Sequence, residues 1–126
     1  MPAPILRLFV MSVLLLAVCR PVVAARAEGG RTRLDVILAV LRLREHQVSR
    51  ACLTAMAEVQ DTEEKVRSHE KDPGAHPDLN LARDVLASDY QNSAQICGAD
   101  ADRVCREASG TDLADACRIL KVEVDQ

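Results

Sequence analysis

Of the five cysteines in this chain, four remain when a predicted secretory signal that contains Cys19 is removed: Cys52, Cys97, Cys105 and Cys117. An even cysteine count in a short exported chain is typical of a disulfide framework. The four are too widely spaced to form the close C-x2-C pairs of structural zinc sites and thioredoxin-like redox sites. We therefore expect all four to form structural disulfides and expect no metal or cofactor.

Four cysteines allow three pairings, and the sequence leaves all three open. The proline- and glycine-rich segment 72–77 would reverse the chain between two helices, and Cys52 and Cys97 lie equally far from its centre. In an antiparallel hairpin they would face each other at the same level. Cys105 and Cys117 flank a Ser-Gly turn. This spacing favours the pairs Cys52–Cys97 and Cys105–Cys117.

Other residue types offer little for catalysis. The sequence contains neither a G-x-S-x-G nor an H-E-x-x-H motif, so we expect no enzyme. His69 and His76 flank the predicted turn, where imidazole and nearby carboxylates could bind a metal ion. An alternative function is therefore a small metal or ligand carrier that uses this tip of the hairpin.

The first 27 residues resemble a secretory signal peptide. Arg7 supplies positive charge, an apolar stretch follows, and Ala25-Arg26-Ala27 places small residues where signal peptidase cleaves. We expect cleavage before Glu28, which leaves residues 28–126 as a single small domain. The alternatives are a membrane anchor, although Arg20 interrupts the apolar stretch, and a lipoprotein, although branched Val18 precedes Cys19.

The amino-acid composition of residues 28–126 disfavours some classes of binding partner. The whole chain has a net charge of −3, and residues 1–27 contain three arginines and no acidic residue, so the remainder is more acidic. Such a charge disfavours nucleic acid and anionic membrane surfaces. The bias of arginine over lysine is typical of a GC-rich bacterium. We expect a periplasmic or secreted protein that is not membrane-bound after cleavage.

The pattern of apolar residues predicts an all-α fold. Apolar positions recur at helical spacing from Thr32 to about Glu70, with no interior Pro or Gly, which predicts one long helix. A single helix of this length is uncommon, so a kinked or split helix is the alternative. A returning helix is expected over Leu79–Cys97, starting from Asp78, with Gly98 ending or bending it. One or two short helices should complete the chain: one over Ala99–Ala108, and one capped by Thr111. The long and returning helices would form a disulfide-linked antiparallel hairpin.

One stretch of the predicted long helix is apolar on every side. It includes Val36, Ile37, Val40 and Leu41. A surface helix keeps one polar face, so more than one neighbour must cover this stretch. Burial within the monomer would satisfy it. A second copy of the chain or an envelope protein would also cover it, so these four residues are a candidate partner surface. The expected function is that of a non-enzymatic binding or scaffold protein.

A short segment near the end of the chain resembles a known repeat. Residues 97–117, CGADADRVCREASGTDLADAC, are similar to the cysteine-rich repeat of Golgi apparatus protein 1 and of small exported bacterial proteins. The family often has Cys-Leu at the third cysteine and a further cysteine beyond it, whereas this chain has Cys117-Arg118 and none after it. The resemblance implies a disulfide-bonded helical exported domain, with no catalytic residues to transfer.

Overall fold

The computed structural model describes residues 22–72, 74 and 77–125, with side chains from residue 28. These ranges contain no strand, and the all-α prediction is confirmed. Residues 1–21 of the predicted signal peptide lie outside the description, as does His76. The elements, in chain order, are α2 (Val22–Arg42), the 3-10 turn η1 (Glu45–Gln47), α3 (Arg50–Lys71), α4 (Pro77–Arg106) and α5 (Thr111–Val124).

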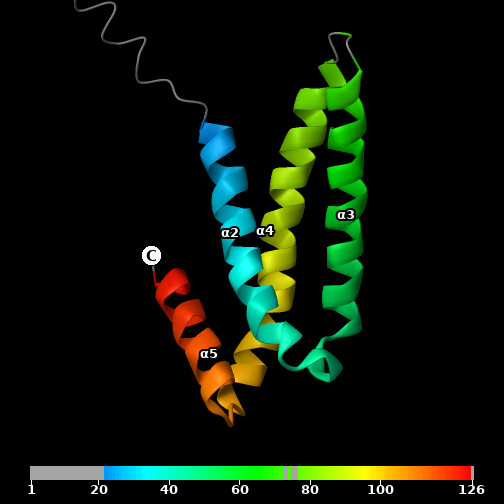
Figure 1. The fold of residues 1–126 in the computed structure, drawn as a ribbon. Coiled ribbons are helices and arrows are strands. Elements are labelled where there is room, and N and C mark those ends of the chain that lie inside the picture. Colours follow the sequence, from blue (N-terminus) through cyan, green and yellow to red (C-terminus); the bar gives the residue numbers. More distant parts are fainter. Residues whose placement is uncertain (1–21, 73, 75–76, 126) are drawn as a thin grey trace, which may run out of the picture.

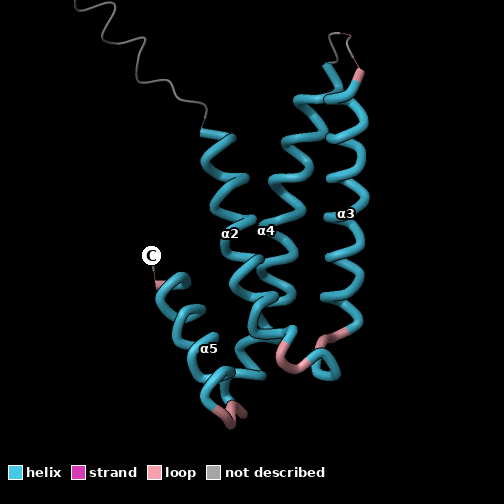
Figure 2. Tube along the Cα trace, viewed as in Figure 1, coloured by secondary structure: helices cyan, strands magenta, loops and turns pink. Residues whose placement is uncertain are grey.

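The helices run alternately down and up the molecule. Figure 1 shows α4 between α2 and α3, with α5 beside the lower half of α2. Because α3 returns the chain before α4 begins, α2 and α4 point in the same direction, as the trace in Figure 2 shows. The predicted hairpin is formed by α3 and α4, and segment 72–77 joins them as expected. Helix α4 is therefore the central element.

The prediction of one continuous helix over residues 32–70 is wrong and the alternative of a split helix is correct, because the chain breaks between α2 and α3. Ser49 is the N-cap of α3, with an extended backbone (φ −71°, ψ 154°), and its side chain accepts a hydrogen bond from the Cys52 N–H. Serine is a preferred N-cap because its oxygen satisfies an otherwise unpaired helix N–H. The long helix therefore becomes two antiparallel arms, and the first can pack against α4.

The predicted end of the returning helix at Gly98 is also wrong, because α4 continues through it to Arg106. Ile37 of α2 packs here: a Cβ added at Gly98 would lie 3.6 Å from its Cδ1 atom. Helix packing thus outweighs the cost of about 1 kcal/mol for glycine inside a helix. The separate helix predicted over Ala99–Ala108 is the last part of α4.

The turn before α5 does depend on glycine. Gly110 is the only described residue with a positive φ, at +105°, and it is the N-cap of α5. Thr111 was predicted to be that cap, but it is the first residue of the helix. A left-handed backbone is readily adopted only by glycine among common residues. The sequence Ser-Gly therefore reverses the chain, as predicted.

The core lies where α4 meets its neighbours. Its buried apolar side chains come from all four helices: Leu34, Ile37, Val40, Leu41, Cys52, Val59, Tyr90, Ala94, Cys97, Ala101, Val104, Leu113 and Leu120. Small residues on α4 let the helices approach closely. Gly30 allows the same on α2, where an added Cβ would lie only 3.2 Å from the Tyr90 Cβ. The core is thus built around α4.

Candidate functional site

One disulfide lies inside the core. Cys52 of α3 is bonded to Cys97 of α4, with their Cα atoms 4.8 Å apart. The two residues are 1% and 0% exposed. The predicted pair is confirmed, and it links the two arms of the hairpin near the lower end of α3.

The second disulfide lies near the surface. Cys105 in the last turn of α4 is bonded to Cys117 of α5, with Cα atoms 5.6 Å apart, which also confirms the predicted pair. Both residues are only partly buried. The bond closes the turn that contains Gly110 and holds α5 to the end of α4.

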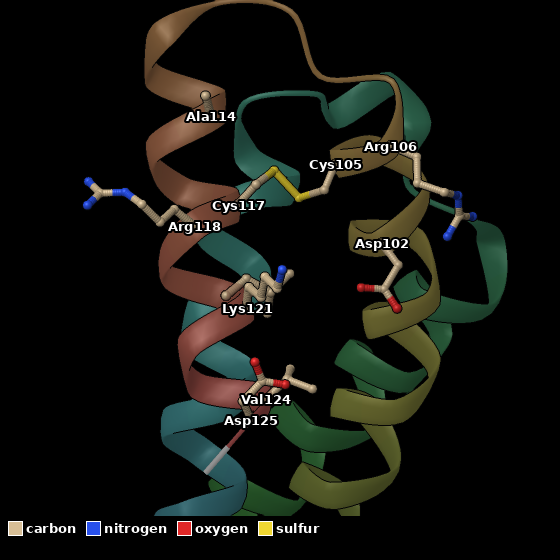
Figure 3. A pocket seen from close by; sticks show the side chains of 10 residues that line it. Asp102, Cys105, Arg106, Ala114, Cys117, Arg118, Lys121, Val124 and Asp125 are labelled. Atoms are coloured by element: carbon tan, nitrogen blue, oxygen red, sulfur yellow. A yellow bond between two sulfur atoms is a disulfide. The ribbon is translucent and has the colours of Figure 1, made fainter.

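A groove of about 640 Å³ opens beside this second disulfide, between α4 and α5. Figure 3 shows the disulfide at one end of the groove and Val124 and Asp125 at the other. Asp102 lies on the α4 wall, and Lys121 projects from α5. The groove therefore combines partly exposed sulfur atoms, apolar surface and charges of both signs. We call it the α4–α5 groove.

Helix α5 also carries an exposed apolar cluster. Ile119 and Val122 are 56% and 58% exposed. They are three residues apart, on the side of the helix that faces away from the buried residues Leu113 and Leu120. Exposed apolar residues that lie side by side are typical of interaction sites, whereas isolated ones are common on any protein surface. We call these two residues the α5 cluster.

The partner surface predicted on the first helix is wrong for three of its four residues. Ile37, Val40 and Leu41 are at most 2% exposed, and Val36 is half-buried against the same core. Helices α4 and α5 both pack on α2 and cover this apolar stretch from two sides. Helices of the same chain therefore supply the neighbours that this apolar stretch requires. Self-association stays a prediction.

The predicted metal site at the hairpin tip cannot be assembled from the described residues. His69 lies in the last turn of α3, whereas His76 is not described. Within residues 22–72, 74 and 77–125, no three His, Cys, Asp or Glu side chains are grouped to hold a metal ion. The carrier function stays a prediction.

A buried carboxylate organises the break between α2 and α3. Asp100 of α4 accepts hydrogen bonds from the Ser49 N–H at 2.7 Å and from the Arg103 guanidinium at 2.8 Å. Arg103 also donates to the Gln47 carbonyl at 2.8 Å. Burial favours protonation of Asp100, but the hydrogen bonds from Ser49 and Arg103 outweigh it and hold the pKa below its usual value. The sequence contained no signal for this contact, which joins residues 51 positions apart.

A second polar contact joins α3 and α4 higher in the hairpin. The Tyr90 hydroxyl donates to the Glu63 carboxylate, and Thr62 donates to Asp89 at 2.7 Å. Burial, and then the hydrogen bond to Glu63, raises the pKa of Tyr90 to about 12. These pairs align the two arms, and the phenol stays protonated over the ordinary pH range.

Comparison of the chain with known proteins identified no related protein. No protein-family model matches the chain, and searches of the curated proteins and the solved structures found no significant match. The resemblance to the Golgi apparatus protein 1 repeat therefore stays a prediction. In the part of the chain with assigned structure, no helix has both the length and the apolar character needed to cross a membrane.

Proposed function

We propose that the region after the predicted signal peptide is an exported, non-enzymatic binding protein that holds an envelope protein on α5. Two disulfides support export, because such bonds persist in oxidising compartments. The α5 cluster is the observation that carries the binding role. The partner surface thus lies on the last helix rather than on the stretch around Ile37.

The geometry of α5 supports this role. The Cys105–Cys117 bond holds the middle of the helix to α4, and Leu113 and Leu120 fix its inner side. A helix held in this way loses little conformational freedom when a partner binds, so less binding energy is lost to ordering. The cluster is therefore presented on a preorganised surface.

The test is quantitative capture from the source cell with the tagged full chain. Val122→Asp places a charge in the α5 cluster and should abolish the enrichment of specific envelope proteins. Leu53→Asp on α3 is the matched control, since Leu53 is 60% exposed and lies on another helix. Circular dichroism establishes that both variants fold. Equal loss in both variants, or capture unchanged by Val122→Asp, would show that α5 is not the binding surface.

A further inference from the structure

The two disulfides differ sharply in their access to solvent. Cys52 and Cys97 are enclosed by core residues, so a reductant reaches their sulfur atoms only after α3 and α4 separate. Cys105 and Cys117 are partly exposed and line the α4–α5 groove (Figure 3). A reductant can therefore approach the second bond in the folded protein.

A cation beside the exposed bond also favours its opening. In thiol–disulfide exchange one sulfur leaves as a thiolate, and nearby cations stabilise that anion. Lys121 lies one turn beyond Cys117 on the same face of α5 and lines the groove, whereas the side chains of Arg106 and Arg118 point away from the disulfide (Figure 3). Asp102 on the facing wall opposes the effect of Lys121.

The buried pair has no comparable charges beside it in the sequence. The neighbours of Cys52 are Ala51 and Leu53, and those of Cys97 are Ile96 and Gly98. A thiolate formed among apolar side chains would be poorly solvated, which disfavours exchange. Access and charge thus point to the same bond.

The helix positions distinguish the two sulfur atoms of the exposed bond. Cys105 is in the last turn of α4, where the negative end of the helix dipole disfavours a thiolate. Cys117 lies in the middle of α5, away from both ends of the helix, and Lys121 follows it one turn later on the same face. Cys117 is therefore the better leaving group, and the Cys105 sulfur is the atom to be attacked.

We propose that Cys105–Cys117 is a site of thiol–disulfide exchange with a dithiol reductant, whereas Cys52–Cys97 is a permanent structural bond. A thiolate of the reductant forms a bond to the Cys105 Sγ, the Cys105–Cys117 bond breaks, and its electron pair goes to the Cys117 Sγ. The second thiol of the reductant then displaces Cys105. The reductant becomes a disulfide, and its two protons are transferred to the two cysteines.

Reduction would loosen α5 without opening the rest of the fold. After the bond breaks, α5 is held by Leu113 and Leu120 and by the hydrogen bond from Arg44 to the Ser109 carbonyl at 3.2 Å. Helices shorter than about 12–15 residues are marginal on their own, and α5 has 14. Backbone amides of α5 should therefore exchange with solvent faster in the reduced form, whereas those of α3 and α4 around Cys97 should not change.

The experiment follows the order in which the bonds open. The oxidised full chain, with Cys19 first blocked by N-ethylmaleimide, is treated with dithiothreitol under native conditions, alkylated, and analysed by peptide mass spectrometry. Alkylation at Cys105 and Cys117 should proceed at least tenfold faster than at Cys52 and Cys97. Equal rates, or earlier reduction of the buried pair, would overturn the proposal.

Two further arms test the charge and the direction of attack. Lys121→Gln should slow reduction at least threefold at low salt, whereas Lys65→Gln on α3 should leave the rate unchanged. A thioredoxin variant that lacks its resolving cysteine should be trapped as a mixed disulfide on Cys105. An unchanged rate in Lys121→Gln, or trapping on Cys117, would contradict the mechanism.

Discussion

The backbone N–H of Ser49 donates a 2.7 Å hydrogen bond to the side chain of Asp100, across 51 residues of sequence. This contact joins the N-cap residue of α3 to the second half of α4. It satisfies a backbone donor in the connection, and the Ser49 side chain caps the next helix. The position at which α3 begins is therefore set partly by a residue on another helix.

Asp100→Asn should destabilise the fold by about 2 kcal/mol, because hydrogen bonds to a charged group contribute about 1.5–3 kcal/mol. The pKa of Asp100 is lowered in the fold. Its contribution is therefore present above the pKa of the unfolded chain, about 4, and is lost as pH falls through the folded value. Urea unfolding between pH 3 and pH 7 measures this slope.

Asp84→Asn is the matched control for that experiment, because Asp84 is exposed on the same helix. It should leave both the stability and the slope nearly unchanged. A wild-type slope in Asp100→Asn would show that this carboxylate does not couple folding to pH.

Removal of the two disulfides should have unequal effects. In the chain-entropy description, a 45-residue separation corresponds to about 4 kcal/mol and a 12-residue separation to about 3 kcal/mol. Replacing Cys52 and Cys97 by Ala also leaves a small cavity in the core, so this double variant should lose more stability than the Cys105/Cys117 double variant. Chemical denaturation measures the loss of stability in both double variants. A larger loss in the Cys105/Cys117 variant would show that the buried bond is not the more stabilising of the two.

Replacing each of the two helical glycines at the α2–α4 contact by alanine should change the stability of the fold in opposite directions. At Gly98 the new Cβ meets Ile37 at an ordinary contact distance, so Gly98→Ala should stabilise by about 0.5–1 kcal/mol through helix propensity. At Gly30 it meets the Tyr90 Cβ at 3.2 Å, and that atom cannot move independently of the α4 backbone. Gly30→Ala should therefore destabilise by about 1 kcal/mol.

Thermal melts of the two single alanine variants give the sign directly. Gly29→Ala is a useful control, because nothing lies within 4 Å of its Cβ position. A gain in stability at Gly30 would mean that α2 does not pack on Tyr90 as described.

Tyr90 should report on the hairpin contact by its own absorbance, since it is the only tyrosine in a chain that lacks tryptophan. Its raised pKa, about 12, predicts that stability is complete below pH 10 and falls as pH rises from about 10 toward 12. Glu63→Gln keeps an acceptor but removes the charge, so the phenol should ionise at lower pH. Spectrophotometric titration measures this shift, and an unchanged titration curve would exclude the contact with Glu63.

Local signals in the sequence were enough to predict the fold class, the hairpin and both disulfide pairs. The proline- and glycine-rich segment 72–77 marks the boundary between α3 and α4, and Gly110 marks the turn before α5. The equal spacing of Cys52 and Cys97 from the turn then placed them at one level. These features depend on residues close together in sequence, or on a simple hairpin geometry.

The features that the sequence did not predict depend on distant residues. The break before Ser49 is stabilised by Asp100, and the continuity of α4 through Gly98 is stabilised by packing of Ile37. The apolar stretch around Val40 indicated correctly that several neighbours were needed, but it did not show that α4 and α5 would supply them. The α4–α5 groove follows from the same packing.

The parallel pairing of α2 with α4 has a consequence for the way the chain acquires its structure. A chain that emerges amino-terminus first presents the apolar stretch of α2 well before its partner, because α3 and the turn come between them. The hairpin of α3 and α4 involves closer contacts in sequence and is expected to form earlier. Until then Ile37 and Val40 have no permanent neighbour. The newly made chain therefore passes through an interval in which a holding chaperone would find its best binding segment on α2.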